Sequence, residues 1–180
     1  NNGAILEAYI VTNWTGDIRN KPSQEMIHIS PHIDYTLISS TGQIKDYRQA
    51  GCHNVKYWQI GYDPKNHFPK FEKTFKYDLS FAGNRYQIND FADCAQRISF
   101  IEFLHNKLGS KFGLFGSGYN KSKYFNVRRT ESVKELNDIY NQSICIFNIS
   151  HYNNTSHYFS DRLLTCLASG RPVISYKFPN

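Results

Sequence analysis

The sequence predicts an α/β protein built on parallel sheets, and two observations lead to this fold class. From Tyr77 onward, apolar runs of strand length alternate with stretches of helix length, which is the pattern of repeated βαβ units. The residues before Pro64 show the same alternation in a shorter form. We therefore expect doubly wound sheets whose faces are covered by helices.

The second part of the chain supplies most of the predicted elements. Ser132 and Ser160 stand at helix N-cap positions, and Glu135 completes a capping box with Ser132. Gly109 and Gly170 are expected to end two of the helices. The predicted strands are 77–82, 111–115, 143–149 and 172–176, and the predicted helices are 90–108, 132–142 and 160–168.

The first part of the chain is predicted to be a smaller α/β unit. It has expected strands at 5–11, 34–39 and 55–60 and an expected helix at 43–50. Residues 61–74 are polar and carry two prolines, so we place the connecting segment there. We predict a partial N-terminal domain with its linker at 1–72 and a C-terminal domain at 73–180. We expect both to be incomplete, because a doubly wound sheet needs more strands and the last strand would leave an open edge.

Composition excludes several classes of protein. No apolar run approaches the roughly 20 residues of a membrane-spanning helix, so we expect a globular, cytoplasmic protein. The four cysteines form no CxxC pair, so neither a metal site nor a redox motif is expected. The net charge of +6 is dispersed along the chain, so we expect no nucleic-acid partner. A diphosphate ligand or peripheral contact with an anionic membrane would account for it.

Candidate ligand-binding residues follow the first two strands of the second part, because ligands of doubly wound sheets bind at the carboxyl ends of strands. After the first strand come Gly83, Asn84 and Arg85, where the glycine would allow close backbone approach and the arginine could reach a phosphate. After the second strand, Gly116-Ser117-Gly118 would leave room for a ribose or pyrophosphate. An ordinary turn explains the Gly83 loop equally well, and a two-glycine turn such as Gly116-Ser117-Gly118 is more often only a turn.

After the third strand, Asn148, Ser150 and His151 offer amide, hydroxyl and imidazole groups, although His151 could be an ordinary loop histidine. The helix expected at 160–168 is the most informative position. Its free N–H groups and dipole would favour a diphosphate, with Arg162 adding charge and Asp161 accepting from hydroxyls. In the alternative reading, Ser160 and Asp161 only cap the helix and Arg162 is solvated.

Several segments resemble a known family in order and spacing. Residues 162–174, RLLTCLASGRPVI, resemble the donor-site segment of GT-B glycosyltransferases. Residues 81–86, 136–150 and 158–164 resemble the C-terminal domain of the spore-maturation-type and related, family-1-like bacterial glycosyltransferases. The stretches NWTGDIR and YWQIGYDPKNHFP resemble the end of the N-terminal domain and the linker of these enzymes, at 13–19 and 57–69.

The resemblance implies a Rossmann-like GT-B fold and transfer of a sugar by a hexosyltransferase-like enzyme. The donor would be a nucleotide-sugar, the acceptor a glycan, a lipid-linked group or a protein, and neither a metal nor another cofactor would be needed. The C-terminal domain would hold the donor and the N-terminal domain the acceptor. The donor-binding residues expected on this basis are Gly83, Asn84, Arg85, Gly116, Ser117, Gly118, Asn148, Ser150, Ser160, Asp161, Arg162, Ser169 and Gly170.

Two further positions qualify this interpretation. Asp17 would face the cleft as the acid/base or acceptor contact, although a turn aspartate beside Gly16 is an equal alternative. Thr165 stands where many GT-B enzymes carry a glutamate that contacts the ribose, so this contact is expected to be weakened or moved. The alternative function is a non-catalytic nucleotide- or carbohydrate-binding module. A dehydrogenase is disfavoured, because no GxGxxG stands between a strand and a helix.

Overall fold

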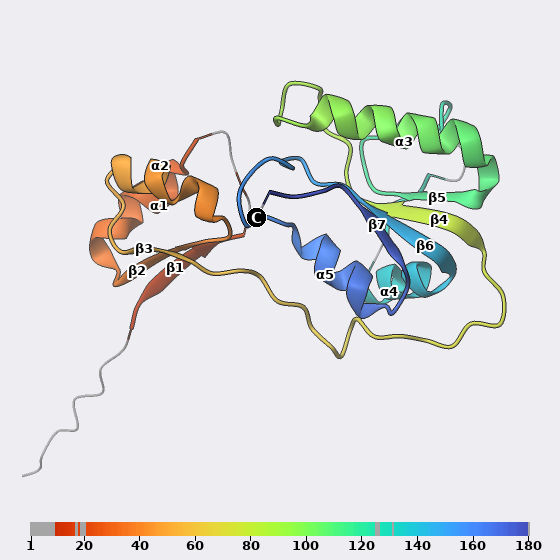
Figure 1. Cartoon of the computed structure of the whole chain (residues 1–180), viewed down its shortest axis with the longest axis horizontal. Coiled ribbons are helices and arrows are strands. Elements are labelled where there is room, and N and C mark those ends of the chain that lie inside the picture. The colour runs from red at the N-terminus through yellow and green to blue at the C-terminus, as the bar shows by residue number, and fades with distance from the viewer. Residues whose placement is uncertain (1–9, 17, 19–20, 125–126, 131, 180) are drawn as a thin grey trace, which may run out of the picture.

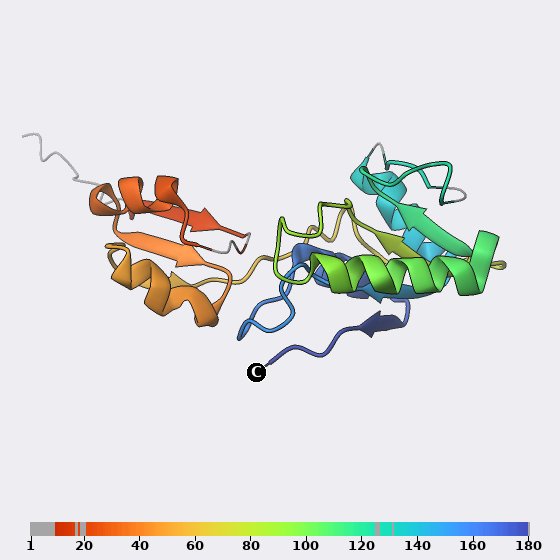
Figure 2. The ribbon, with the colours of Figure 1, turned by 90° about the horizontal axis from the view of Figure 1, so that it is seen from above.

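The computed structural model describes residues 10–16, 18, 21–124, 127–130 and 132–179. It shows two all-parallel sheets joined by an extended segment (Figures 1 and 2). One sheet has the strand order β1-β2-β3 and the other the order β5-β4-β6-β7; we call them the first and second sheet. The predicted α/β class with Rossmann-like parallel sheets is therefore confirmed.

The first sheet carries both of its helices on one face (Figure 1). Each new strand lies on the same side of the preceding one, in the order β1-β2-β3, so right-handed crossovers place both helices on the same face. Its core joins Met26, Ile38, Tyr47 and Val55. The elements are β1 (Thr12–Thr15), α1 (Gln24–Ile29), β2 (Tyr35–Ile38), α2 (Ile44–Gln49) and β3 (Val55–Tyr57). The sequence analysis missed α1. Of the strand expected at 5–11, residues 5–9 lie outside the described residues, and the prediction was wrong for residues 10 and 11, because the first described strand begins at Thr12.

The second sheet contains every strand and helix predicted for it. Its strands are β4 (Tyr77–Ala82), β5 (Phe112–Phe115), β6 (Ser143–Asn148) and β7 (Val173–Ser175). Its helices are α3 (Cys94–Leu108), α4 (Val133–Asn141) and α5 (Asp161–Ala168). The expected start of α3 at residue 90 was wrong, because the helix begins at Cys94. The carboxylate of the preceding Asp93 accepts hydrogen bonds from the backbone and the side chain of Asn153. These bonds fix the start of the helix beside the loop after β6.

Short 3₁₀ turns extend or precede three helices. They are η1 (Ser30–His32), η2 (Thr41–Gln43) and η3 (Gly109–Lys111). The cap predicted at Ser132 is confirmed, because its hydroxyl accepts from the backbone N–H of Glu135 at 3.1 Å. The side-chain cap predicted at Ser160 was wrong, because this serine makes no capping hydrogen bond to α5.

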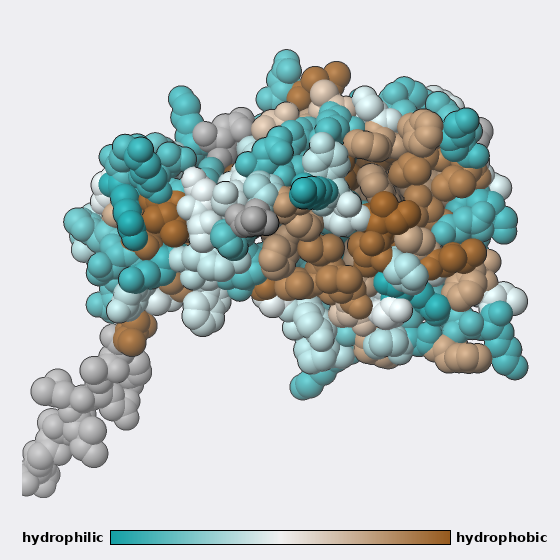
Figure 3. Space-filling view, viewed as in Figure 1, coloured by the Kyte–Doolittle hydropathy of each residue, from teal (hydrophilic) through white to brown (hydrophobic). Residues whose placement is uncertain are grey.

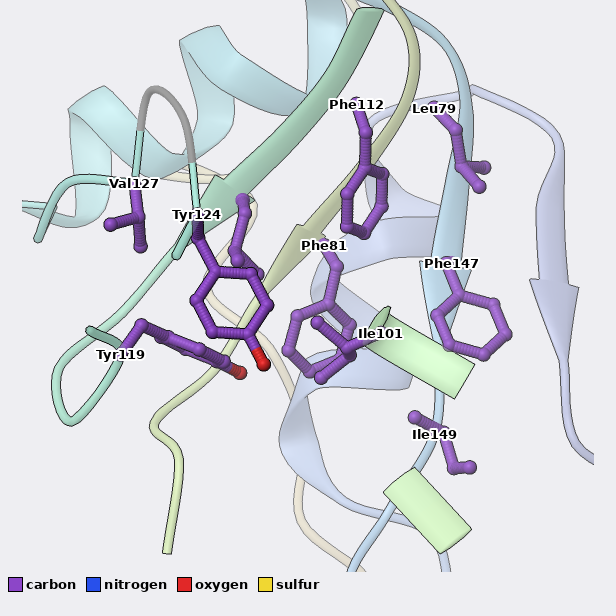
Figure 4. Packing of buried hydrophobic residues seen from close by; sticks show 10 residues of the cluster. Leu79, Phe81, Ile101, Phe112, Tyr119, Tyr124, Val127, Phe147 and Ile149 are labelled. Atoms are coloured by element: carbon purple, nitrogen blue, oxygen red, sulfur yellow. The ribbon is translucent and has the colours of Figure 1, made fainter. Parts of the chain in front are cut away.

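The second sheet is wound on both faces, with α3 on one side and α4 and α5 on the other (Figure 1). Phe81, Phe112 and Ile149 are fully buried in the cluster on the α3 side (Figure 4). Ile146 and Tyr140 are equally buried in the cluster on the other side. The central strands are thus apolar on both faces, as expected for a parallel sheet covered by helices.

The segment between the sheets is fixed to α4 by two buried asparagines. Asn137 accepts from the backbone N–H of Phe68, and Asn141 accepts from that of Lys70 and donates to the carbonyl of Phe68. Pro69 lies against Gly170 at the end of α5. This segment is therefore packed structure over part of its length and crosses the α4 and α5 side of the sheet (Figure 1).

The loop before α5 contacts the first sheet through side-chain hydrogen bonds. These bonds run from Ser40 Oγ to the carbonyl of Ser156 (3.0 Å), between Thr41 Oγ1 and His157 Nδ1 (2.8 Å), and from Gln59 Nε2 to the carbonyl of Phe159 (2.9 Å). His157 has a φ of +54°, an unusual backbone conformation for a residue other than glycine. The carboxyl edge of the first sheet and the start of α5 are thus directly connected.

The surface differs between the two sheets. Hydrophilic side chains cover most of the first sheet, whereas hydrophobic ones gather over the second (Figure 3). Leu167 of α5 and Ile174 of β7 are each more than half exposed. None of the described helices is long and apolar enough to cross a membrane.

We predict that Asn141→Ala lowers the free energy of unfolding by about 2–4 kcal/mol, because it leaves the backbone groups of Lys70 and Phe68 without their partner. Chemical denaturation measures the change. Asn106→Ala on the exposed side of α3 is the matched control and should change stability little. An equal effect of both substitutions would show that the segment is not held by Asn141.

Candidate functional site

The candidate site lies at the carboxyl ends of β4 and β6, where the winding direction of the second sheet reverses. From β4 the chain crosses to β5, whereas from β6 it crosses to β7 on the opposite side. Such switch points leave a crevice for ligands in doubly wound folds. Two neighbouring cavities of about 430 and 140 Å³ open here. Asn84, Asp161 and Arg162 line both cavities and form their shared wall.

Two arginines meet beside Gly83 in this wall. Arg97 comes from α3 and is 2% exposed, while Arg162 comes from the first turn of α5. Their guanidinium carbons lie 4.9 and 5.4 Å from the ring centre of Phe81, close enough for cation–π contact. A Cβ atom on Gly83 would lie 3.0 Å from Arg162 Nη2 and closer still to Arg97 Nη2. Both side chains therefore reach the same point.

The two arginines have no negative partner in the described part of the chain. Arg97 donates to the carbonyl of Asn84 and to His151 Nε2, and Arg162 donates to the carbonyl of Ile149. None of the ion pairs among the described residues includes either arginine. Burial and the nearby Arg162 lower the pKa of Arg97 to about 9. Two close positive charges with neutral partners favour an anionic ligand.

His151 serves as a neutral support for Arg97. Burial, with the charges of Arg97 and Arg162, lowers the pKa of His151 to about 3. Because Nε2 accepts from Arg97, the ring proton is on Nδ1, which faces the Cys94 sulfur at 3.3 Å. The ring also packs edge-on against Tyr86. The imidazole therefore orients a guanidinium group that lines the smaller cavity.

The N-terminus of α5 faces both cavities through Asp161 and Arg162. The Asp161 carboxylate accepts from the backbone N–H of Arg162 at 2.8 Å. Ser160 lines the smaller cavity, where its hydroxyl accepts a long hydrogen bond of 3.5 Å from Ser150. The helix dipole, Arg162 and Arg97 thus give this wall a positive potential.

The glycines after β5 allow two loops to pack closely. Gly116 has a φ of +140°, and a side chain there would collide with the Gly83 carbonyl. Gly118 has a φ of +83°, and a side chain there would collide with the Arg85 carbonyl. Gly116 lines the larger cavity, but the backbone of Arg85 fills the space beside Gly118 that we expected a ligand to occupy.

Several predicted site residues lie away from the walls of these two cavities. Ser117 donates from its backbone to the Asn84 side chain, which joins the loops after β4 and β5. Asn148 is buried and donates to Ser175, and the Ser169 hydroxyl donates to the carbonyl of Cys166. Arg85, near Glu102 and Tyr124, and Gly170, beside Pro69, also lie away from these walls. Asp17 lies outside the described residues, so its role stays a prediction.

Arg97 and His67 are among the residues lining the site that sequence reasoning missed. Arg97 shares the buried stripe of α3 with Cys94, Ile101 and His105, so a charged residue at a core position of the helix was the available signal. His67 lines the larger cavity from the segment between the sheets, and no local pattern marks it. The described residues contain no group of three or more His, Cys, Asp or Glu side chains that could hold a metal ion.

The part of the chain that supplies both arginines matches a protein-family model. Residues 96–179 are similar to the glycosyl transferase-like family. This segment runs from within α3 to the residues after β7, so it includes the carboxyl ends of β5, β6 and β7 but not that of β4. No curated protein matches the chain. The glycosyl transferase-like match supports glycosyl transfer as the general function.

We predict that the free energy of unfolding of the parent protein falls more steeply on acidification than the free energy of unfolding of the His151→Gln variant. The unfolded state takes up a proton near the usual histidine pKa of about 6.5, whereas folded His151 stays neutral until about pH 3. The stability due to neutral His151 is therefore complete above pH 6.5 and is lost as the pH falls toward 3. The difference in slope is at most about 1.4 kcal/mol per pH unit, the value for one proton.

Urea denaturation between pH 7 and pH 4.5 measures these slopes. His28→Gln, on the exposed side of α1, is the matched histidine replacement. Identical slopes for the parent and His151→Gln would contradict a neutral, buried imidazole beside Arg97.

Proposed function

We propose that the protein is a nucleotide-sugar-dependent glycosyltransferase that binds its donor at the carboxyl edge of the second sheet. The observation that carries this proposal is the pair of arginines, Arg97 and Arg162, which converge without a negative partner among the described residues. A diphosphate supplies the missing charge. The glycosyl transferase-like match over residues 96–179 supplies the reaction class.

The two cavities suit the two ends of such a donor. The larger one, about 430 Å³, has apolar walls from Phe115, Val133 and Leu136 and is within the usual size of small-molecule pockets, so we assign it to the nucleoside. The smaller one, about 140 Å³, has polar walls that include Ser150 and Ser160, so we assign it to the sugar. The diphosphate then lies over their shared wall at Arg162.

The proposed mechanism depends on charge that develops on the leaving group. As the bond from the sugar to the diphosphate breaks, negative charge grows on the phosphate oxygens beside Arg162 and Arg97. Preformed donors and a helix N-terminus stabilise such charge without reorganisation, and their effect is strong in a partly buried site. These groups could fulfil the role that a metal ion has in other transferases, so we propose metal-independent transfer.

The acceptor is proposed to bind on the side of the first sheet. The hydrogen bonds from Ser40, Thr41 and Gln59 bring the carboxyl edge of this sheet against the loop before α5. A glycan, lipid-linked group or protein bound there would face the donor sugar, as in a GT-B arrangement. Asp17 as the acid/base, residues 1–72 as the acceptor domain, the spore-maturation-type relationship and a cytoplasmic location remain predictions.

A donor-hydrolysis assay separates catalysis from binding alone. The purified protein is incubated with UDP-, GDP- and CMP-sugars in the presence of EDTA, and released nucleotide is measured. A transferase releases nucleotide slowly to water, whereas a non-catalytic binding module retains the intact donor. An absolute requirement for magnesium or manganese would contradict the proposed metal independence.

We predict that Arg162→Ala weakens binding of UDP or GDP by about 10- to 100-fold while leaving uridine or guanosine affinity nearly unchanged, because charged hydrogen bonds to phosphate are lost. Titration calorimetry with each nucleotide and nucleoside measures both affinities. Arg48→Ala, in α2 of the first sheet, is the control for loss of one positive charge. Equal losses for nucleotide and nucleoside would remove Arg162 from the phosphate site.

We also predict that Gly83→Ala weakens nucleoside-diphosphate binding by roughly tenfold, the equivalent of one displaced charged hydrogen bond. The added methyl group would meet Arg97 and Arg162 and push both guanidinium groups from their common point. Gly61→Ala is the matched control, because no atom of the described residues lies within 4 Å of the added Cβ. A folded Gly83→Ala protein that binds UDP and GDP as tightly as the parent would show that the arginine pair does not bind the diphosphate.

A further inference from the structure

His67 brings the segment between the two sheets into the larger cavity. The residue lines this cavity together with Asp161, Arg162 and Thr165 of α5. It is 6% exposed, which is unusual for a histidine in a polar connecting segment. The proposed donor site therefore includes a residue from outside the second sheet and its helices.

The position of His67 is fixed by its neighbours in sequence. The backbone N–H of Phe68 donates to Asn137 at 3.2 Å, and that of Lys70 donates to Asn141 at 2.6 Å. Both asparagines are at most 1% exposed and belong to α4, which forms another wall of the same cavity. His67 is thus held at the cavity by buried hydrogen bonds on its C-terminal side.

The imidazole of His67 has unused hydrogen-bonding capacity. Its Nδ1 is inaccessible to water and has no hydrogen-bond partner in the described part of the chain. Burial lowers the pKa of His67, although the nearby Asp63 and Asp161 oppose this shift, so the ring is neutral at pH 7. A neutral imidazole presents one nitrogen that accepts a hydrogen bond. A buried polar atom without a partner is costly, so a turn of the ring that brings Nδ1 to a ligand hydroxyl in the cavity would be stabilising.

The other polar groups of the cavity differ from His67 in what they offer a ligand hydroxyl. The Thr165 hydroxyl donates to the carbonyl of Arg162 at 3.0 Å, so it can still accept a hydrogen bond but is not left without a partner. Arg162 and Arg129 line the cavity as donors only. Asp161 uses one carboxylate oxygen for the backbone of Arg162 and would repel a neighbouring phosphate. His67 and Tyr140 are the two residues lining this cavity that have a buried polar atom without a hydrogen-bond partner among the described residues. Of the two, the neutral imidazole has a nitrogen that only accepts, whereas the phenol hydroxyl also donates.

We propose that His67 binds the ribose hydroxyls of the donor nucleotide. This inference rests on the proposed function, which places the diphosphate at Arg162 and the nucleoside in the larger cavity. The ribose joins these two parts, so it lies beside the wall that His67 shares with α5. The connecting segment is then a specificity-determining part of the donor site as well as the link between the sheets.

The test removes the ribose hydroxyls and the imidazole separately and together. UDP, GDP, CDP and ADP are titrated by calorimetry against the full chain, and the tightest binder is compared with its 2′,3′-dideoxy form. We expect the dideoxy form to bind about tenfold more weakly to the parent protein, the effect of roughly one to two hydrogen bonds. In His67→Ala the ribo and dideoxy forms should bind equally.

Two further variants make the result specific. His67→Asn places an amide oxygen close to the position of Nδ1 and should keep most of the preference for the ribo form, whereas His67→Phe keeps the ring but should lose it. Tyr62→Ala, in the exposed part of the same segment, should bind like the parent. Circular dichroism confirms that each variant is folded, and His67→Phe replaces His67→Ala if the latter is not.

The outcomes separate this inference from the function on which it rests. If no nucleoside diphosphate binds the parent protein, the proposed donor site itself is wrong. If a diphosphate binds but the preference for the ribo form is absent, or persists unchanged in His67→Ala and His67→Phe, the role of His67 is overturned while the donor site stands.

Discussion

Two guanidinium groups that share the ring of Phe81 determine how the carboxyl edge of the second sheet is built. Arg97 and Arg162 come from helices on opposite faces of the sheet, and they meet only because Gly83 has no side chain. Bringing like charges together in a partly buried place is unfavourable without compensation. The neutral groups of Asn84 and His151 hold Arg97, and the Ile149 carbonyl holds Arg162, but none of them cancels the charge. The fold is therefore prepared for an anion at this point.

The loops around this pair are arranged to keep it in place. Hydrogen bonds from Gly83 N–H to the Phe115 carbonyl and from Arg85 N–H to the Ser117 carbonyl, each 2.8 Å long, join the loops after β4 and β5. Gly116 permits this contact, because any side chain there would strike the Gly83 carbonyl. The glycines of the site therefore shape the protein around the arginines, and the ligand space lies to the side of them.

The regular elements could be predicted because their signals are local. Apolar runs of strand length, helix-ending glycines and the cap at Ser132 are properties of a few neighbouring residues, and the second sheet has its strands and helices where they indicated. The six-residue α1 was missed because its sequence, QEMIHI, is too short to show helical periodicity and contains two β-branched isoleucines. The start of α3 depends on Asp93 bonding to Asn153, which is distant in sequence.

The candidate site could be predicted only where topology alone determines position. Gly83, Asp161 and Arg162 follow strands or begin a helix at the carboxyl edge, so a rule about parallel sheets was enough to bring them together. Arg97 and His67 reach the same place through packing of a helix and a connecting segment, which no spacing in the sequence encodes. Ser169 and Gly170 follow the C-terminal end of α5, as the helix predicted at 160–168 already implied, and they lie away from the walls of both cavities.

The hydrogen bonds between the first sheet and the loop before α5 also couple the position of the first sheet to the start of this helix. Thr41 and Gln59 bond to His157 and Phe159, which directly precede the helix that carries Arg162. A rotation of the first sheet must either break these bonds or pull on the start of α5. Strain at the positive φ of His157 would be transmitted in the same direction. The geometry of the phosphate-facing helix end is thereby tied to the relative orientation of the two halves of the molecule.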